Sequence, residues 1–355
     1  MTVVSLTSKE RRPTIRRWPA QPPTRVRGPS RPVDTRRGSR QAERVGRLGA
    51  TGTVARAEGP AGALGGGGAA SHVIRASDGV ELHCLRWPDG QVEPWAVMVF
   101  LHGIASHGGW FGETAVDLEK QGVAVYAPDR RGSGRSGGRR GDLAHYERAL
   151  DDLDDVLRFV ASEHQGTPVF LAASSWAAKL AVVHAALRPA PLSGLMLLGP
   201  GLIPRVDLAP ARKLQVVVGH VIVPTAHIGI PLTPEQYTTT PRYLDFIRAD
   251  PLRLLEATAR FFWQTGRLDR RRRSASAQLL LPILVLVGEG DAMMDVPKTR
   301  GWFAGLGIED KTYVAYPGAG HTLDFEPDRS RYLADMLAWL SSRASSPSPH
   351  QAGRP

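Results

Sequence analysis

A serine lies where a strand-like run turns directly into a helix-like run. Residues 170–181 read FLAASSWAAKLA, so an apolar strand pattern ends beside Ser175 and a helical pattern begins at once. A turn of this kind lifts a serine to the carboxyl edge of a sheet, where its Oγ can act as a nucleophile. We therefore predict that Ser175 is the nucleophile. The alternative is an ordinary turn in which Ser174 or Ser175 caps the helix.

A carboxylate and a histidine follow two later strand-like runs. The run 282–287 leads to Asp291, and a glycine-rich loop ends at His321. A general base needs this loop freedom to reach a serine on one side and a carboxylate on the other. We predict Asp291 as the acid, with Glu289 and Asp295 as alternatives. The order serine, aspartate, histidine, each after a strand, is that of α/β-hydrolase triads.

A second strand-like run leads into the loop 102–107, HGIASH. In this position the amide of Ile104 could point at a developing oxyanion, and the amide of Trp176, next to the nucleophile, would be the second donor. We interpret His102 as a brace for the loop rather than as an acid or base. The candidates for contact with substrate are His102, Gly103, His107 and Trp110.

The elements that would position these groups alternate along the chain. Short, continuous, β-branched runs are typical of strands covered on both faces, and they alternate here with helical patterns. This predicts an α/β fold with a mostly parallel, eight-stranded sheet and helices on both faces. The predicted strands are 71–74, 81–86, 96–101, 123–127, 169–173, 195–198, 283–287 and 312–315. The predicted helices are 113–121, 145–163, 176–187, 297–304 and 328–340.

One interval is too long for a crossover between neighbouring strands. We interpret 202–278 as an inserted helical cap, with helices predicted at 241–249 and 251–265. The core would then consist of two parts, 71–201 and 279–340. Residues 1–70 and 341–355 are poor in apolar residues and rich in Arg, Pro, Gly and Ser, which predicts disordered tails. For the first tail, a transit-like segment or a misassigned start are the alternatives.

Charge is concentrated in the first tail. Residues 1–70 hold 14 Lys and Arg against four acidic residues, a net of +10 out of +11 for the whole chain. The nearly neutral remainder gives no reason to expect a nucleic-acid partner. The single cysteine, Cys84, cannot form an intramolecular disulfide, and no apolar run follows the N-terminal arginine pairs. We therefore expect a cytoplasmic protein.

Between its tails the chain resembles the monoacylglycerol lipase/lysophospholipase branch of the α/β-hydrolases. Residues 102–111 (HGIASHGGWF) are similar to that branch's oxyanion segment, and residues 128–136 (PDRRGSGRS) are similar to its loop after a strand. Ser175, Asp291 and the Gly-x-Gly loop ending at His321 stand where that branch has its triad. The elbow departs from the usual Gly-x-Ser-x-Gly pattern, because both glycines are alanine.

The resemblance implies a serine hydrolase that cleaves carboxylic esters, such as monoacylglycerols, lysophospholipids or similar acyl esters, through an acyl-enzyme. No cofactor or metal is expected, because the triad requires none. A peptidase, an amidase or an acyltransferase with the same triad is the alternative among enzymes. A catalytically weak hydrolase-fold binding protein is the alternative from another class, and the alanines at 173 and 177 are the feature that favours it.

The apolar parts of the cap bear on the substrate. The runs 216–218, 221–223, 228–232 and 261–263 suit an acyl chain, although they could equally pack the cap's own core. They lead us to predict a small-molecule acyl ester as the partner, with transient membrane or lipid contact through the cap. The arginine-rich run 267–273 is interpreted as a solvated face at the cap's edge, with a lipid-headgroup site as the alternative.

Overall fold

The computed structural model describes residues 68–87, 93–188 and 190–344. Most of the two predicted tails, 1–67 and 345–355, therefore lies outside the described residues. The start predicted for the C-terminal tail is wrong, because 341–344 complete the last helix, α8 (Ser330–Ala344). Arg343 holds this end in place, since its guanidinium lies 4.4 Å above the Trp339 ring and pairs with Asp310.

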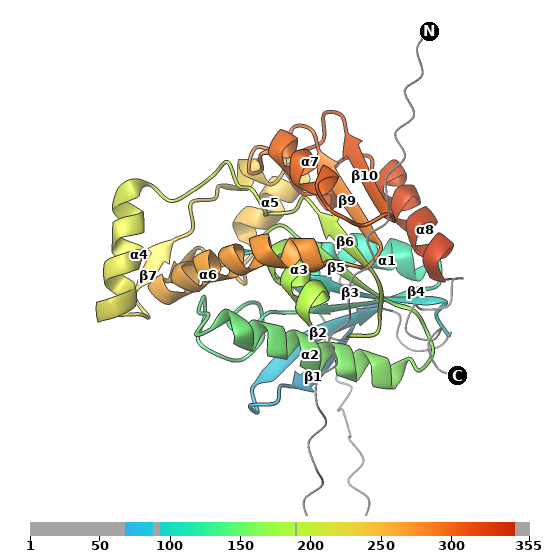
Figure 1. Cartoon of the computed structure of the whole chain (residues 1–355), viewed down its shortest axis with the longest axis horizontal. Helices are drawn as coiled ribbons and strands as arrows, with labels where there is room; N and C mark the ends of the chain where they lie inside the picture. The colour runs from blue at the N-terminus through green and yellow to red at the C-terminus, as the bar shows by residue number, and fades with distance from the viewer. Residues whose placement is uncertain (1–67, 88–92, 189, 345–355) are drawn as a thin grey trace, which may run out of the picture. The chain divides into compact units, whose positions relative to one another are not determined.

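All eight predicted strands form one sheet, each within three residues of its predicted ends, and this confirms the fold class (Figure 1). The strand order is β1-β2-β4-β3-β5-β6-β9-β10; β1–β2 and β2–β4 are antiparallel and the other pairs are parallel. The bounds are β1 (Ala70–Arg75), β2 (Glu81–Trp87), β3 (Ala96–Leu101), β4 (Val123–Pro128), β5 (Val169–Ser174), β6 (Leu192–Leu198), β9 (Ile283–Gly288) and β10 (Lys311–Tyr316).

Helices cover both faces of this sheet. Because side chains alternate along a strand, β3 sends Val97 and Val99 into one hydrophobic core and Met98 and Phe100 into the other. Helices α2 (Tyr146–Glu163), α3 (Ala177–Leu187) and α7 (Val296–Ala304) pack into the first core, and α1 (Gly112–Glu119) and α8 into the second. The carboxyl ends of the parallel strands therefore lie along one edge of the sheet, and both faces of the sheet are buried.

The interval between β6 and β9 includes residues 202–278, which we predicted to be an inserted cap, and we refer to it as the cap segment. It contains α4 (Pro210–Ile222), β7 (His227–Gly229), α5 (Pro241–Ala249), β8 (Glu256–Thr258) and α6 (Ala259–Ala275). The predicted helix 251–265 is wrong in its first half: β8 pairs with β7, and α6 begins only after Thr258, whose side chain accepts from the Phe261 amide. The arginine run is not all solvated either, since Arg272 is buried and donates to the carbonyl of Leu202.

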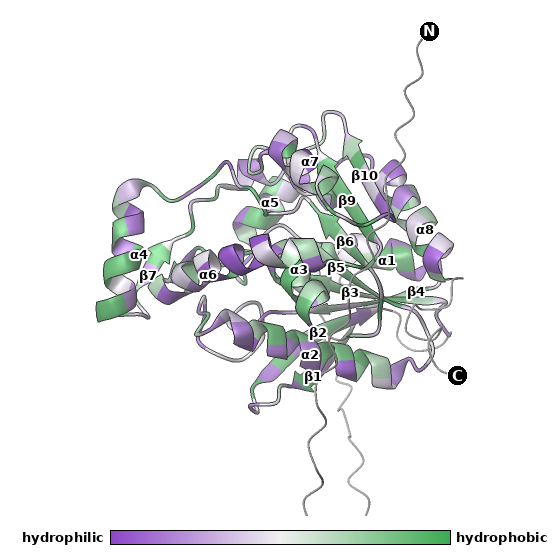
Figure 2. Ribbon diagram, viewed as in Figure 1, coloured by the Kyte–Doolittle hydropathy of each residue, from purple (hydrophilic) through white to green (hydrophobic). Residues whose placement is uncertain are grey.

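Helix α4 exposes an apolar surface. Of its residues only Val216 is buried, whereas Val221 is 77% and Ile222 is 72% exposed. Figure 2 shows apolar residues along this helix, which lies at the side of the molecule away from β9 and β10. Within the described ranges, no helix is long and apolar enough to cross a bilayer.

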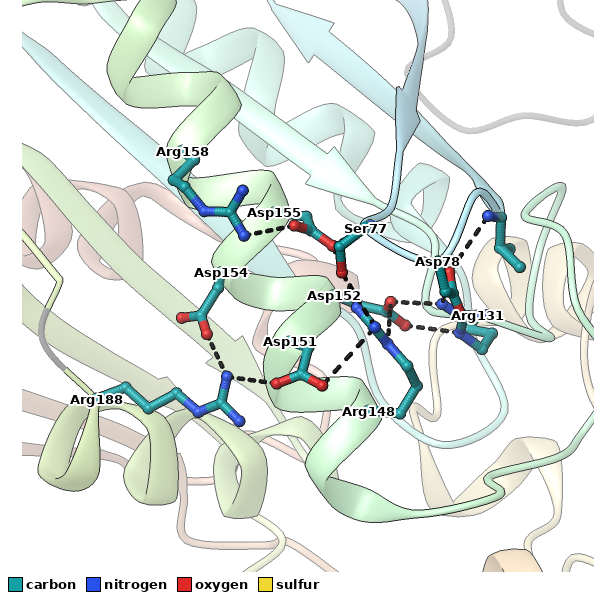
Figure 3. A network of polar contacts seen from close by, with 11 residues as sticks. Ser77, Asp78, Arg131, Arg148, Asp151, Asp152, Asp154, Asp155, Arg158 and Arg188 are labelled. Atoms are coloured by element: carbon teal, nitrogen blue, oxygen red, sulfur yellow. Dashed lines mark hydrogen bonds and ion pairs between the residues drawn. The ribbon is translucent and has the colours of Figure 1, made fainter. Parts of the chain in front are cut away.

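A network of ion pairs fixes the loop that follows β4 (Figure 3). Arg131 donates from Nε and from its terminal nitrogen to the two oxygens of Asp152 on α2, at 2.9 and 2.7 Å. Arg148 also donates to Asp152, and Arg131 reaches Asp78 in the turn between β1 and β2. The network ties α2, the β1–β2 turn and the loop that carries Arg130 and Arg131 together.

Candidate active site

The backbone of Ser175 has the strain of a nucleophile elbow. Its φ is +53°, and it is the one non-glycine residue with positive φ in the described part of the chain. L-residues other than glycine enter this region at a cost, so such an outlier is a sign of function. Ala173 and Ala177, which replace the usual glycines, are both fully buried. The elbow therefore keeps its conformation with alanine at both positions.

The turn at Ser175 packs closely against a glycine, Gly201, in the loop that follows the neighbouring strand β6. A Cβ at Gly201, just after β6, would lie 2.7 Å from the carbonyl carbon of Ser175. The Gly201 amide donates to the Ser175 carbonyl at 2.8 Å, which ties the two loops together. Sequence reasoning missed this residue, although the GPG triplet directly after a strand-like run was a signal for it.

His321 and Asp291 form a buried pair next to Ser175. His321 Nδ1 lies 2.7 Å from Asp291 Oδ2, while Asp291 Oδ1 accepts from the amides of Met293 and Met294 at 2.8 and 3.1 Å. Because the carboxylate is fixed by these amides, it can orient the imidazole with Nδ1 protonated. His321 Nε2 is buried with no hydrogen-bond partner among the described residues, and His321 and Ser175 line one small cavity.

The two alternative acids lie elsewhere. Asp295 caps α7, where its Oδ1 accepts from the Lys298 amide at 3.0 Å. Glu289 is exposed at the end of β9. Neither contacts His321, so the structure brings Asp291, and not its two competitors, to the histidine.

Two backbone amides are available beside Ser175. The amides of Ile104 and Trp176 donate to no acceptor within the described residues. Gly103 allows close approach of this loop, because a Cβ there would lie 3.2 Å from the Ser175 Cβ. Ile104, Ser175 and Trp176 also line one cavity. The two amides predicted for an oxyanion hole therefore lie on the two segments that meet at Ser175.

Arg130 braces both of these segments, and sequence reasoning did not single it out. One terminal nitrogen of its guanidinium donates to the carbonyls of Gly103 and Ile104 at 3.0 and 2.9 Å. The group also lies 4.7 Å from the centre of the Trp176 ring. Because a trans peptide points its C=O and N–H in opposite directions, holding the Gly103 carbonyl aims the Ile104 amide away from Arg130. Burial lowers the pKa of Arg130 to about 10, so it stays charged at neutral pH.

We expect Arg130→Gln to lower kcat for a soluble ester by about 10- to 100-fold with little change in KM. The reason is that a misaligned oxyanion donor weakens binding of the transition state more than binding of the substrate. Steady-state kinetics give kcat and KM separately and so show whether the loss lies in kcat alone. Arg135→Ala, in the same loop and exposed, is the control and should leave both constants unchanged. Equal losses in the two variants would contradict the role of Arg130.

The predicted substrate-contact residues have different surroundings. His102 donates from Nδ1 to the Gly103 carbonyl and accepts from the Arg130 amide, both at 2.9 Å, and burial together with Arg130 lowers its pKa well below the usual value. A neutral histidine with both nitrogens occupied serves as a brace for the loop. His102, Gly103 and Trp110 line the small cavity at Ser175, whereas His107 is absent from that lining.

His107 and Trp110 instead meet a cap residue. Trp110 Nε1 donates to Asp250 Oδ2 at 2.7 Å, and His107 Nε2 lies 3.3 Å from the same oxygen. Burial opposes the charge on Asp250, but its hydrogen bonds with His107 and Trp110 hold its pKa below the usual value. This contact fixes the cap to the loop that carries Ile104. Sequence reasoning missed Asp250, which follows α5.

Two cavities open at Ser175. The larger has a volume of about 730 Å³ and runs from Ser175, Ile104 and Trp176 to the cap helices α4 and α6. Its apolar lining comes largely from the cap: Val216, Val217, Ile230, Leu232, Phe262 and Trp263. The smaller has a volume of about 20 Å³ and lies among Ser175, His321 and Tyr237. The site thus has one large, mostly apolar space and one space the size of a water molecule.

A second Ser–His–Asp chain lies at the edge of the sheet. Ser71 Oγ lies 2.8 Å from His83 Nε2, and His83 Nδ1 lies 2.9 Å from Asp129 Oδ2. Ser71 has the extended backbone of strand β1, and neither it nor His83 lines the cavities at Ser175. Asp129 also accepts from the amides of Gly108 and Arg135. These three residues are therefore a structural brace, and Ser71 offers a natural control for Ser175.

The fold and the site define the chain as an α/β-hydrolase. It belongs to the family described as serine aminopeptidase, S33, whose sequence profile matches residues 92–328. The chain is 28% identical over 279 residues to a monoacylglycerol lipase of Mycolicibacterium smegmatis, covering 76% of this chain and 96% of that protein. It is also 28% identical to a monoglyceride lipase of Rattus norvegicus, covering 77% and 90% of the two chains.

A crystal structure of the Paleococcus ferrophilus monoacylglycerol lipase shares the fold, with a TM-score of 0.66 at 24% identity over 74% of this chain and 99% of that one. The predicted resemblance to the monoacylglycerol lipase-like branch is thereby confirmed, and the chain is a carboxylic ester hydrolase. In the described ranges, no group of three or more His, Cys, Asp or Glu side chains could hold a metal ion.

Proposed function

We propose that the chain hydrolyses monoacylglycerols, lysophospholipids or similar acyl esters, with Ser175 as nucleophile, His321 as base and Asp291 as acid partner. The observation that carries this proposal is the positive φ of Ser175 beside the buried His321–Asp291 pair. A serine in this conformation presents its Oγ at the sheet edge where the unpartnered Nε2 lies.

The reaction would proceed in two halves. In the first, His321 Nε2 takes the proton of Ser175 while Oγ attacks the ester carbonyl, and the amides of Ile104 and Trp176 stabilise the oxyanion. The imidazolium then protonates the leaving alcohol, and an acyl-enzyme remains. In the second half, water attacks this ester with His321 as base, which releases the carboxylic acid and restores Ser175.

The large cavity supports an acyl chain as the apolar part of the substrate. Its volume of about 730 Å³ lies within the range of ligand pockets, and apolar side chains of α4 and α6 line it. Charged residues, among them Lys179, Lys213 and Arg270, lie at other points of the lining. An amphipathic ester fits this combination better than a wholly polar one.

Labelling with a fluorophosphonate probe tests the proposal. We expect one equivalent of probe on the folded protein, with the adduct mapped by mass spectrometry to the peptide that contains Ser175. In parallel, monoacylglycerols and 4-nitrophenyl esters of graded chain length should be hydrolysed. A well-folded protein that takes up no probe and cleaves no ester would refute the proposal and leave a binding role.

The family description names an aminopeptidase, so amide cleavage is the second candidate. Aminoacyl 4-nitroanilides in the same assay distinguish the two activities. Hydrolysis of the anilides with kcat/KM above that of the esters would replace the proposed reaction by amide hydrolysis at the same triad.

We also propose that α4 makes transient contact with lipid surfaces. The exposed apolar side chains lie on the helix that lines the acyl cavity: Leu214, Val217, Val218, Val221 and Ile222. A contiguous apolar patch of this kind marks an interaction site, and basic residues precede it on the same helix. A substrate that dissolves in lipid would enter the cavity from that surface.

We expect Val221→Asp with Ile222→Asp to reduce sedimentation with phospholipid vesicles by about tenfold or more, because two charges would have to enter the interface. Hydrolysis of a water-soluble acetate ester should stay unchanged. Leu280→Asp is the matched control, since Leu280 is 88% exposed but lies outside the cap. An equal effect of the control, or no effect of the double variant, would contradict lipid contact through α4.

A further inference from the structure

The cavity of about 20 Å³ beside Ser175 has the size of one water molecule. Two buried side-chain atoms among its lining residues have no hydrogen-bond partner: His321 Nε2 and the Tyr237 hydroxyl. A third polar group of the lining, the Asp324 carboxylate, already accepts from Thr114 and Tyr332. Buried polar atoms in native proteins are nearly always satisfied, by water where no protein group is near. One occupant of this cavity would satisfy both.

We infer that this cavity holds the water that attacks the acyl-enzyme, and that the Tyr237 hydroxyl is the positioning group for it. The inference rests on the proposed function. One O–H of the water is donated to His321 Nε2 and the other to the Tyr237 oxygen. A lone pair of the water is then free to face the acyl carbon on Ser175.

The step balances with these groups alone. The water oxygen forms a bond to the acyl carbon while its proton passes to His321 Nε2, and Asp291 stabilises the imidazolium. The tetrahedral intermediate then breaks the bond to Ser175 Oγ, which takes the proton back from His321. The products are a carboxylic acid and the free enzyme. Tyr237 exchanges no proton in this sequence.

The fold holds Tyr237 firmly against the catalytic histidine. Its carbonyl accepts from the Thr322 amide, the residue after His321, at 3.0 Å. Its ring packs edge-on against Trp110 and His321, with ring centres 5.3 and 6.2 Å apart. Burial raises the pKa of Tyr237, so the phenol is neutral over the working range of the enzyme. The cap thus contributes a fixed hydroxyl to a site otherwise built from the core.

Pre-steady-state hydrolysis of 4-nitrophenyl acetate by Tyr237→Phe tests the inference. The variant loses only the hydroxyl, so acylation should be unchanged and deacylation should slow by about tenfold, the effect of one hydrogen bond. We expect a burst of one equivalent of nitrophenol, followed by a kcat about tenfold lower. KM should fall in proportion, so kcat/KM stays constant. A merely structural role would lower kcat/KM instead.

Tyr243→Phe is the matched control. Tyr243 is an equally buried cap tyrosine, but its hydroxyl donates to Glu113 and it lies outside this cavity. An unchanged kcat in Tyr237→Phe, or a loss of kcat/KM, would overturn the inference but would not contradict the proposed ester hydrolysis. Failure of the wild type to form an acyl-enzyme would overturn the proposed function and the inference together.

A crystal structure at high resolution provides a second test. It should show a water molecule within hydrogen-bond distance of His321 Nε2 and of the Tyr237 hydroxyl, and an empty cavity would overturn the inference.

Discussion

Ser175→Ala is expected to lower kcat for ester hydrolysis by about 10⁶-fold, because the variant has no nucleophile for the histidine to activate. The remaining activity would come from the oxyanion donors and from substrate binding alone. KM for a soluble ester should change little, since the side chain removed is small. The measurement is steady-state hydrolysis of a 4-nitrophenyl ester, with circular dichroism to verify the fold.

Ser71→Ala is the control that the chain itself offers. Ser71 Oγ lies at hydrogen-bond distance from His83, which in turn pairs with Asp129, as in a catalytic triad, but Ser71 lies in a regular strand. We expect the turnover of this variant to equal that of the wild type. If Ser71→Ala lost activity and Ser175→Ala kept it, the nucleophile would be misassigned.

Asp291→Asn is expected to lower kcat by about 10⁴-fold with the fold intact. The physical reason is the fixed orientation of this side chain. Asp291 Oδ1 accepts from two amides, so the asparagine carbonyl would occupy that position and its NH₂ would face His321 Nδ1. Nδ1 would then have to accept, which places the proton on Nε2 and removes the base. Stopped-flow acylation rates at neutral pH measure the loss.

Asp295→Asn tests whether the acid is correctly chosen. Asparagine caps helices about as well as aspartate, so neither the stability of α7 nor kcat should change by much. Glu289→Gln should also be neutral, because that side chain is exposed. A large loss in either variant, with Asp291→Asn active, would show that another carboxylate orients His321.

The sheet could be predicted because its signals are local. Continuous apolar runs such as 96–101 and 123–128 are buried on both faces, and each carries the evidence for its own strand. The strained turn at Ser175 could be predicted for the same reason, since a strand turns into a helix within a few residues. Between β6 and β9, helix α5 was predicted at its observed bounds, whereas α4 was not predicted, because only Val216 of its residues is buried and it shows no buried stripe.

Residues that act through distant contacts could not be predicted. Tyr237 and Asp250 reach the site from the cap, and Arg130 reaches it from the loop after β4. Their neighbours in sequence carry no sign of these partners. The sequence pattern alone could not separate Asp291 from Asp295, because both follow the same strand. In the structure they lie apart, since Asp291 accepts from the amides of Met293 and Met294 in the turn between the two aspartates.

The positive φ of Ser175 has a consequence for how this protein can be altered. Holding an L-residue in the left-handed region costs about 1–2 kcal/mol, a sizeable fraction of the stability of a typical domain. Glycine at this position would relieve the cost and remove the proposed nucleophile. Selection for thermal stability alone would therefore favour inactive variants at position 175. A stabilised variant that keeps its activity must gain its stability at positions away from the elbow.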